Sequence, residues 1–127
     1  MTAVLGKVRR PDGRGHPVQV DFLVDSGALY SVLPEKVWRM LKLRATRTAK
    51  FGLADGTVIG RGVSECRFEI GGQAAVSPAV LGEGDDGPLL GAVTLETLGL
   101  MLNPLTRELA PMRVLPLMRA PELHERA

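Results

Sequence analysis

The chain has 127 residues, of which 45% are hydrophobic and 4% aromatic, and its formal net charge is +2. This length suits one domain with a core of aliphatic side chains, while the small net charge and scattered basic residues exclude the electrostatic footprint of a nucleic-acid-binding protein. No apolar run reaches the roughly 20 residues of a membrane-spanning helix, and the first residues lack the apolar core of a signal peptide, so we expect a soluble, cytoplasmic protein that contacts no membrane.

The beginning of the chain predicts a β-hairpin followed by a helix. Residues 3–8 and 16–24 have the composition of strands, and a segment rich in Pro, Asp and Gly joins them. The second strand runs directly into a carboxylate, Asp25, which is an unusual end for an apolar strand. Residues 33–43 then predict a helix, with Pro34 in its first helical position.

The middle of the chain predicts a long hairpin and one further strand. Residues 51–72 form the hairpin, with Asp55-Gly56 as a two-residue turn, and residues 73–82 form the strand. In the second arm of the hairpin, charged residues alternate with a set that shares the other face: Ser64, Cys66, Phe68 and Ile70. Cys66 is the only cysteine, so no internal disulfide is possible, and its place in this set predicts an inert core residue.

The last third of the chain predicts a short helix and a second hairpin. Thr94 can cap the start of the helix and Gly99 can close its end. Residues 100–112 predict a pair of strands around Asn103, and a charged tail follows over residues 113–127. Strand pairs separated by Gly-containing turns favour a mostly β fold, a small barrel or sandwich with two short helices.

The residues needed for metal, nucleotide or serine-nucleophile chemistry are missing from the sequence. His16 lies in a turn and His124 in the tail, and neither has a partner at a ligand spacing. The acidic loop at residues 83–86 lacks the spacing of a calcium loop and predicts a solvated surface. Ser26 lacks a G-x-S-x-G setting, and no phosphate-binding or dinucleotide fingerprint occurs. We therefore expect neither a metal nor a cofactor.

Asp25 has two interpretations. As a structural residue, it caps a turn by accepting backbone N–H bonds. As a chemical group, it is a general base on water, placed in a turn where Gly27 lets another backbone or a ligand come close. One carboxylate is not enough to act as both acid and base on an amide, whereas two carboxylates that share a proton can divide the roles.

The segment DFLVDSGALYSVLP, residues 21–34, resembles the catalytic segment of retropepsin-like aspartic proteases, the single-lobe family of retroviral proteases and their cellular and bacterial relatives. That family shows two hydrophobic residues followed by Asp, Thr or Ser, Gly and Ala, and residues 25–28 match it. Downstream, PLLGAVTLETLGL resembles the family's hydrophobic-hydrophobic-Gly triplet and the helix after it. Between them, GLADGTVIGRG, residues 52–62, lies where the family has its flap, a hairpin that closes over the substrate. The resemblance covers roughly residues 4–112.

The resemblance implies a small closed β-barrel of the retropepsin-like type with one or two short helices. It implies a single domain over residues 1–127, with a core at about 4–112 and a tail at about 113–127. It also implies an aspartic endopeptidase whose catalytic residue is Asp25. The supporting positions fall into three groups, namely the turn residues Ser26, Gly27 and Ala28, the flap residues Ala54, Asp55, Gly56 and Thr57 near the substrate, and the triplet Leu89, Leu90 and Gly91 behind the turn.

A single chain carries only one of the two carboxylates that this chemistry needs. The other Asp-Gly pairs lack the intervening hydroxyl residue: Asp12-Gly13, Asp55-Gly56 and Asp86-Gly87. An active enzyme therefore implies a homodimer in which two copies of Asp25 meet on the twofold axis and act on a peptide or protein substrate. The resemblance implies that each Ser26 hydroxyl bonds across that axis.

Two features depart from the family pattern. Asp55 places a charge at the flap tip, and the chain after Pro111 gives no obvious terminal strand of the kind by which retroviral dimers interleave. An alternative function is therefore a catalytically silent dimer that binds extended peptides, and a third is a monomeric barrel that binds a small molecule. Quaternary state discriminates among them, because a stable monomer cannot bring two carboxylates together.

Overall fold

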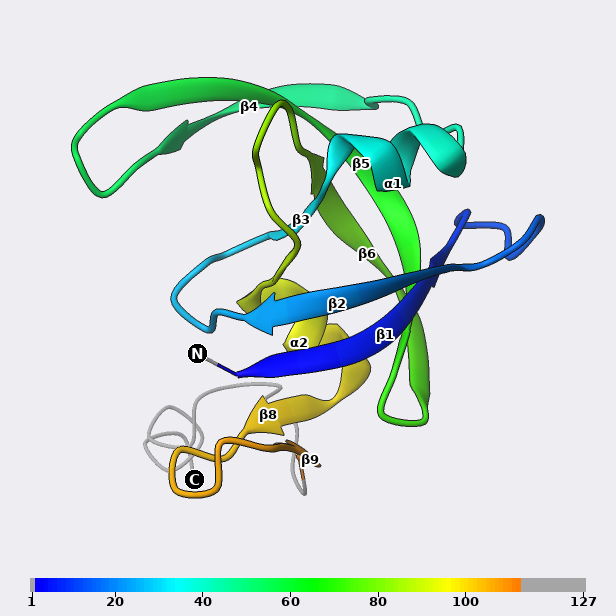
Figure 1. Cartoon of the computed structure of the whole chain (residues 1–127), viewed down its shortest axis with the longest axis vertical. Coiled ribbons are helices and arrows are strands. Elements are labelled where there is room, and N and C mark those ends of the chain that lie inside the picture. Colours follow the sequence, from blue (N-terminus) through cyan, green and yellow to red (C-terminus); the bar gives the residue numbers. More distant parts are fainter. Residues whose placement is uncertain (1, 113–127) are drawn as a thin grey trace, which may run out of the picture.

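The structure is a computed structural model, and it describes residues 2–112 (Figure 1). The strands are β1 (Ala3–Arg9), β2 (Val18–Val24), β3 (Ser31–Leu33), β4 (Arg47–Gly52), β5 (Val58–Ile70), β6 (Gln73–Leu81), β7 (Leu89–Leu90), β8 (Leu100–Leu102) and β9 (Leu109–Pro111), and the helices are α1 (Glu35–Met40) and α2 (Ala92–Leu98). The predicted mostly β fold with two short helices is confirmed. The predicted tail and His124 lie outside the described residues. Within residues 2–112, no helix is long and apolar enough to cross a membrane.

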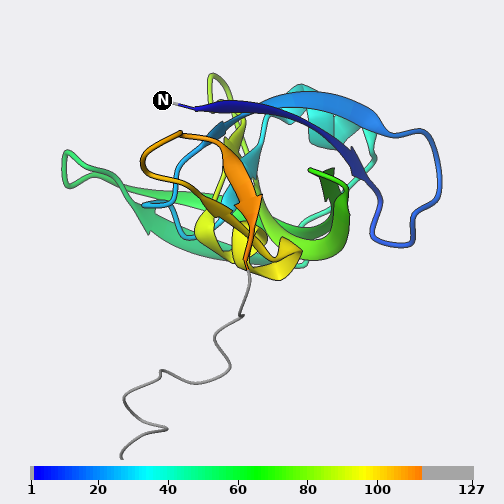
Figure 2. The ribbon, with the colours of Figure 1, turned by 90° about the horizontal axis from the view of Figure 1, so that it is seen from below.

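The main sheet curls until its strand pairings return to the first strand. Its order is β1-β2-β7-β3-β6-β5-β4, and β1 also pairs with β5. The six strands β1, β2, β7, β3, β6 and β5 therefore form a closed cycle of pairings, as a small barrel requires. Figure 2 shows the sheet wrapping around its interior. Within residues 2–112, β4 pairs only with β5, so the β4–β5 hairpin extends beyond the cycle, and a separate two-stranded sheet joins β8 and β9.

Alternating side chains of the sheet fill the interior. In β2, Val20, Phe22 and Val24 are buried while the residues between them are exposed. The Phe22 ring packs against Phe68 of β5, with 5.8 Å between the ring centroids. The predicted inward-facing set of β5 is confirmed, because all of its members are buried: Ser64, Cys66, Phe68 and Ile70.

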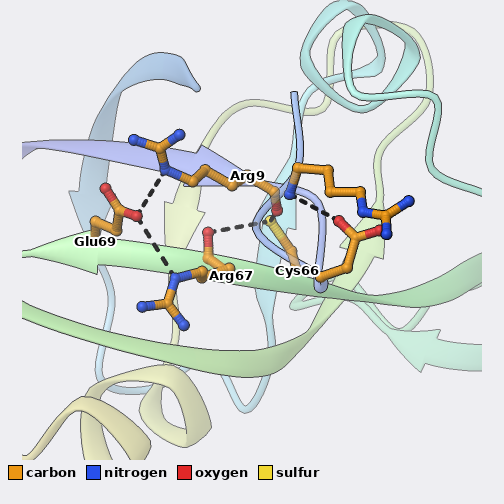
Figure 3. Close-up of polar contacts among 6 residues, drawn as sticks. Arg9, Cys66, Arg67 and Glu69 are labelled. Atoms are coloured by element: carbon orange, nitrogen blue, oxygen red, sulfur yellow. Dashed lines mark hydrogen bonds and ion pairs between the residues drawn. The ribbon is translucent and has the colours of Figure 1, made fainter. Parts of the chain in front are cut away.

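Polar side chains support the pairing of β1 with β5 that closes the cycle (Figure 3). Arg9 Nε lies 2.7 Å from Glu69 Oε2, and Arg67 Nε lies 3.6 Å from the same oxygen. On the inner face, the Cys66 thiol points to the carbonyl oxygen of Arg9 at 3.4 Å. Burial raises the pKa of this thiol to about 12, so it stays protonated and unreactive, as the sequence predicted.

Both helices begin one to three residues away from the predicted positions. Pro34 precedes α1 as its N-cap residue, since its ψ of 151° is extended rather than helical. The prediction that Thr94 caps α2 is wrong: Gly91 is the N-cap residue, and Thr94 lies buried inside the helix. The predicted end of α2 is confirmed, because Gly99 has a left-handed φ of 69°.

The turn of the β4–β5 hairpin is longer by one residue than predicted. Gly52 pairs with Val58, and the N–H of Leu53 donates to Thr57 O at 2.7 Å, which leaves three residues in the loop. The last of them, Gly56, has a φ of 88°. A type I turn followed by a left-handed residue is the usual three-residue solution, so Gly56 serves as the bulge residue rather than as half of a two-residue turn.

Candidate active site

Asp25 sits at the end of β2, in a turn that the backbone holds from two sides. Its N–H donates to Leu90 O at 3.0 Å, and the N–H of Ala28 donates to Asp25 O at 3.1 Å. Its carboxylate accepts the N–H of Gly27 at 3.0 Å on Oδ1, which fixes the orientation of the side chain. Asp25 is half-buried, while Ser26 and Gly27 are exposed. Among residues 2–112, no basic side chain forms an ion pair with Asp25.

The triplet Leu89, Leu90 and Gly91 lies directly behind this turn. β7 runs between β2 and β3, parallel to the first and antiparallel to the second. Leu90 is fully buried. A Cβ on Gly91 would lie only 2.6 Å from the carbonyl carbon of Tyr30, so no other residue fits there without moving the backbone. The structure therefore brings together the two sequence motifs that lie about 60 residues apart.

The start of α2 forms backbone hydrogen bonds with the residues that follow the Asp25 turn. The N–H of Ala92 donates to Ala28 O at 2.8 Å, and the N–H of Val93 donates to Leu29 O at 3.0 Å. These contacts extend the support of the turn from one residue to the whole segment that follows Asp25.

A buried group of three hydroxyls supports the same region, and sequence reasoning missed it. The hydroxyl of Thr94 bonds to those of Ser31 and Ser77, at 2.5 Å and 2.9 Å, and the Gly91 N–H donates to Ser31 Oγ at 2.9 Å. All three side chains are buried. They come from β3, β6 and α2, so only the fold brings them together, and no local pattern signals them.

A pocket of about 410 Å³ opens beside the Asp25 turn and under the β4–β5 hairpin. Gly27 and Leu89 border it, and the apolar side chains that line it include Leu29, Tyr30, Val32, Phe51, Leu53 and Ile59. The turn residues Gly27 and Ala28 line the pocket, whereas the predicted substrate residues of the flap, 54–57, do not. The preceding part of the hairpin contributes instead. The aromatic side chain of Phe51 in β4 could have indicated this part of the pocket from the sequence.

The flap tip, residues 54–57, is exposed throughout and projects from the body of the molecule. Both views place it on the side of the molecule where the segment between β2 and β3 lies (Figures 1 and 2). Within it, the Asp55 carboxylate accepts the N–H of Thr57 at 2.9 Å. Hydrogen bonds from the side chain and backbone of Thr57 lower the pKa of Asp55, so its charge stabilises the turn that it occupies.

The acidic loop is only partly the solvated surface that the sequence predicted. Asp86 lines the pocket and lies 2.7 Å from Arg61 Nε, and it also accepts the N–H of Glu83 at 2.9 Å. The Arg61 hydrogen bond lowers the pKa of Asp86, so this carboxylate is held ionised and bound. Asp85 and Glu83 are exposed. In the described part of the chain, no group of three or more His, Cys, Asp or Glu could hold a metal ion.

This arrangement offers one oriented, cation-free carboxylate per chain at the edge of an apolar pocket. A carboxylate so placed can accept a proton from water, and among residues 2–112 no basic side chain forms an ion pair with it. Acid catalysis on the same bond needs a second group. Asp86 is unsuited to that role, because its bonds to Arg61 keep it charged.

Comparisons with known proteins find a matching family and a similar fold. A sequence profile described as aspartyl protease matches residues 12–94, a segment that includes Asp25, the flap tip and the Leu89–Gly91 triplet. Among solved structures, the chain is similar to the solution structure of the simian foamy virus (mac) protease, with a TM-score of 0.53 and 17% sequence identity. The match covers 74% of this chain and 91% of the viral chain, and it indicates a shared fold. No protein with a curated description matches the chain.

Proposed function

The chain belongs to the aspartyl protease family, and on that premise we propose that it is an aspartic endopeptidase that hydrolyses peptide bonds as a homodimer. The observation that carries the proposal is the Asp25 carboxylate: oriented by Gly27, free of cations among residues 2–112 and beside an apolar pocket. The similarity in fold to a retroviral protease supports it, as does the position of the β4–β5 hairpin on the same side of the molecule as the segment between β2 and β3 (Figures 1 and 2). No metal or cofactor is required.

A second copy of the chain would supply the second carboxylate. The Asp-Ser-Gly triplet occurs once, and the other Asp-Gly sites are committed to local structure. Asp12 accepts the N–H of Arg14, Asp55 holds the flap turn, and Asp86 is bound to Arg61. In the twofold dimer the two copies of Asp25 meet at the axis, with the exposed Ser26 hydroxyls bonding across it.

The proposed reaction uses these two carboxylates and one water. A peptide binds as an extended strand and pairs its backbone with the flaps. Two carboxylates this close share one proton, since like charges at short distance cannot both ionise. The ionised Asp25 takes a proton from the water, which attacks the scissile carbonyl, while the protonated Asp25 donates to the carbonyl oxygen. Because the pair titrates as a unit, activity is expected to fall on both sides of an optimum pH.

The remaining predicted residues support the carboxylates or the substrate. Gly27 and Ala28 shape the turn and the pocket wall, and Leu89, Leu90 and Gly91 hold the turn from behind. The flap tip, residues 54–57, would close over the peptide backbone. All of these act within one domain, for which we propose the core predicted from the sequence, about residues 4–112.

Cleavage of a diverse peptide library from acid to neutral pH tests the proposal, with wild type and Asp25→Asn compared side by side. We expect cleavage by the wild type only, and an unchanged dimer in sedimentation for both. Asp12→Asn is the matched control, because this exposed carboxylate also accepts a local N–H but lies in the β1–β2 turn. Full activity of Asp25→Asn would overturn the mechanism. A wild-type dimer that binds peptides but cleaves none would favour the silent peptide-binding dimer instead.

A further inference from the structure

One guanidinium group, that of Arg61, lines the apolar pocket, and a second, that of Arg47, contacts the lining residue Tyr30; the two differ in how their charges are neutralised. Arg61 lines the pocket, and its side chain is 17% exposed. Its Nε lies 2.7 Å from Asp86 Oδ2, and its Nη1 lies 3.9 Å from Glu83 Oε1. The charge of Arg61 is therefore satisfied within the chain.

Arg47 has no such partner in the described part of the chain. Its Nη2 donates to the hydroxyl of Tyr30 at 2.9 Å, and its Cζ lies 5.6 Å from the centroid of the Tyr30 ring. Tyr30 lines the pocket and packs edge-on against Phe51, with 6.2 Å between ring centroids. Within residues 2–112 no carboxylate forms an ion pair with Arg47, which is exposed. Tyr30 thus orients a guanidinium that keeps unused N–H donors.

The strand geometry places Arg47 on the pocket side of the flap hairpin. Successive residues of a strand point to opposite faces, so Arg47 shares a face with Phe51, which lines the pocket. Across the hairpin, Phe51 pairs with Ile59, another lining residue. Lys50 lies on the opposite face of the same strand.

We propose that Arg47 is a specificity-determining residue that binds a substrate carboxylate next to an apolar side chain seated in the pocket. The inference rests on the proposed function, since it names the substrate class of that site. A planar guanidinium suits a carboxylate because it can donate two parallel N–H bonds, and the Tyr30 contacts reduce the freedom lost on binding. The carboxylate comes from a Glu or Asp side chain or from a free chain terminus.

Peptide binding to the Asp25→Asn protein tests this inference without cleavage. The probes share one apolar residue and carry Glu, Gln or Lys beside it, each with a free or an amidated C-terminus. We expect the Glu peptide to bind about tenfold more tightly than the Gln peptide, the range of a hydrogen-bonded charge pair. Arg47→Glu should reverse the order, so that the Lys peptide binds best. Arg47→Lys should retain only part of the preference, because it keeps the charge and loses the planar fork.

Lys50→Glu is the matched control, since it makes the same charge change on the same strand but on the other face. An equal shift by Lys50→Glu overturns the inference, and so does binding that changes neither among the Glu, Gln and Lys peptides nor on amidation of the C-terminus. A loss on amidation that is independent of the Glu side chain assigns the carboxylate to the chain terminus. Thermal unfolding of each variant verifies that the exposed substitutions leave the fold intact.

The same peptides separate this inference from the proposed function when the wild type is assayed for cleavage. Selective binding without any cleavage by the wild type supports the role of Arg47 and overturns the endopeptidase. Cleavage with the same kcat/KM for the Glu, Gln and Lys peptides, whether their C-terminus is free or amidated, supports the endopeptidase and overturns the role of Arg47. Failure of every peptide to bind overturns both.

Discussion

The turn that carries Asp25 and the β4–β5 hairpin border the same pocket, but the molecule holds the turn and the tip of the hairpin in opposite ways. Around Asp25, hydrogen bonds come from distant parts of the chain: its N–H donates to Leu90 O, and the first N–H groups of α2 donate to Ala28 O and Leu29 O. At the flap tip, residues 54–57, the hydrogen bonds stay within the hairpin and every residue is exposed.

The difference separates a fixed element from one that can move. A residue that acts on a bond must be held within a fraction of an ångström, which is achieved by contacts from several elements behind it. A hairpin tip with few buried contacts opens at a low free-energy cost, so a substrate can enter and the tip can close after it. The proposed function needs both behaviours on one side of the molecule. Substitutions around the Asp25 turn should therefore lower the stability of the fold, whereas substitutions at the flap tip should mainly change how the substrate is bound.

Gly91→Ala should have the largest effect. The new Cβ would lie 2.6 Å from the carbonyl carbon and 2.7 Å from the carbonyl oxygen of Tyr30, and backbone atoms cannot move aside as a side chain can. We expect a loss of at least about 3 kcal/mol in the free energy of unfolding, at the upper end of overpacking effects. Denaturant unfolding measures it. Gly60→Ala is the control, because nothing lies within 4 Å of a Cβ there, and an equal loss for both variants would contradict the packing explanation.

Thr94→Val should have the second largest effect. The substitution keeps the shape of the side chain but removes the hydroxyl that bonds to Ser31 and Ser77. Buried hydroxyls that lose a partner cost about 1–3 kcal/mol, so we expect a loss of about 2 kcal/mol in the free energy of unfolding.

Thr97→Val on the same helix is the control for this prediction. The Thr97 hydroxyl is exposed and, among the described residues, bonds to Val93 O alone, so its removal should change stability by less than about 0.5 kcal/mol. If the hydroxyls position the Asp25 turn, Thr94→Val should also lower kcat more than it raises KM, and Thr94→Ser should restore kcat. A fall in stability with unchanged kcat would limit the hydroxyls to a structural role.

The same contrast explains what the sequence could predict. The alternation of β5 and the left-handed Gly99 are local features, since each follows from side-chain period or backbone preference within a few residues. The motif around Asp25 and the Leu89–Gly91 triplet were found because each is a continuous stretch. These features identified the family and the two sequence motifs that meet at the site.

Several features escaped prediction because they depend on contacts between distant segments. Thr94 satisfies the local rule for a helix cap, but its burial against Ser31 and Ser77 places it inside the helix. β3 and β7 have three and two residues, too few for a periodic pattern, and they exist because neighbouring strands pair with them. Arg61 and Asp86 lie 25 positions apart, so no local pattern pairs them.

Asp86→Asn should have a smaller effect, and one that depends on pH. The pKa of Asp86 is lowered from its ordinary value of 3.8, mainly by the hydrogen bond from Arg61. A lowered pKa in the folded state stabilises the protein above pH 3.8, and that contribution disappears as the pH falls through the lowered value. We expect Asp86→Asn to be less stable than wild type by under about 1 kcal/mol at neutral pH, since the pair is partly exposed.

The difference in stability between Asp86→Asn and wild type should shrink in acid, and unfolding midpoints across pH measure it. A difference that stays constant with pH would assign the effect to packing.

Asp55→Ala should change stability least of the four, because Asp55 is fully exposed and its carboxylate holds only its own turn through Thr57. Its effect on the substrate should be larger than its effect on the fold. Removing the Thr57 contact loosens the tip, and removing the charge clears the path of a peptide backbone beneath it, so we expect KM and peptide preference to change while kcat is nearly kept. Cleavage of the peptide library by the variant measures this.

Asp55→Asn separates the loss of the Thr57 contact from the loss of the charge, because an Asn side chain keeps the bond to the Thr57 N–H without the charge. If Asp55→Ala lowers the unfolding midpoint strongly and leaves cleavage unchanged, the tip is a structural turn, and the contrast with the Asp25 turn fails.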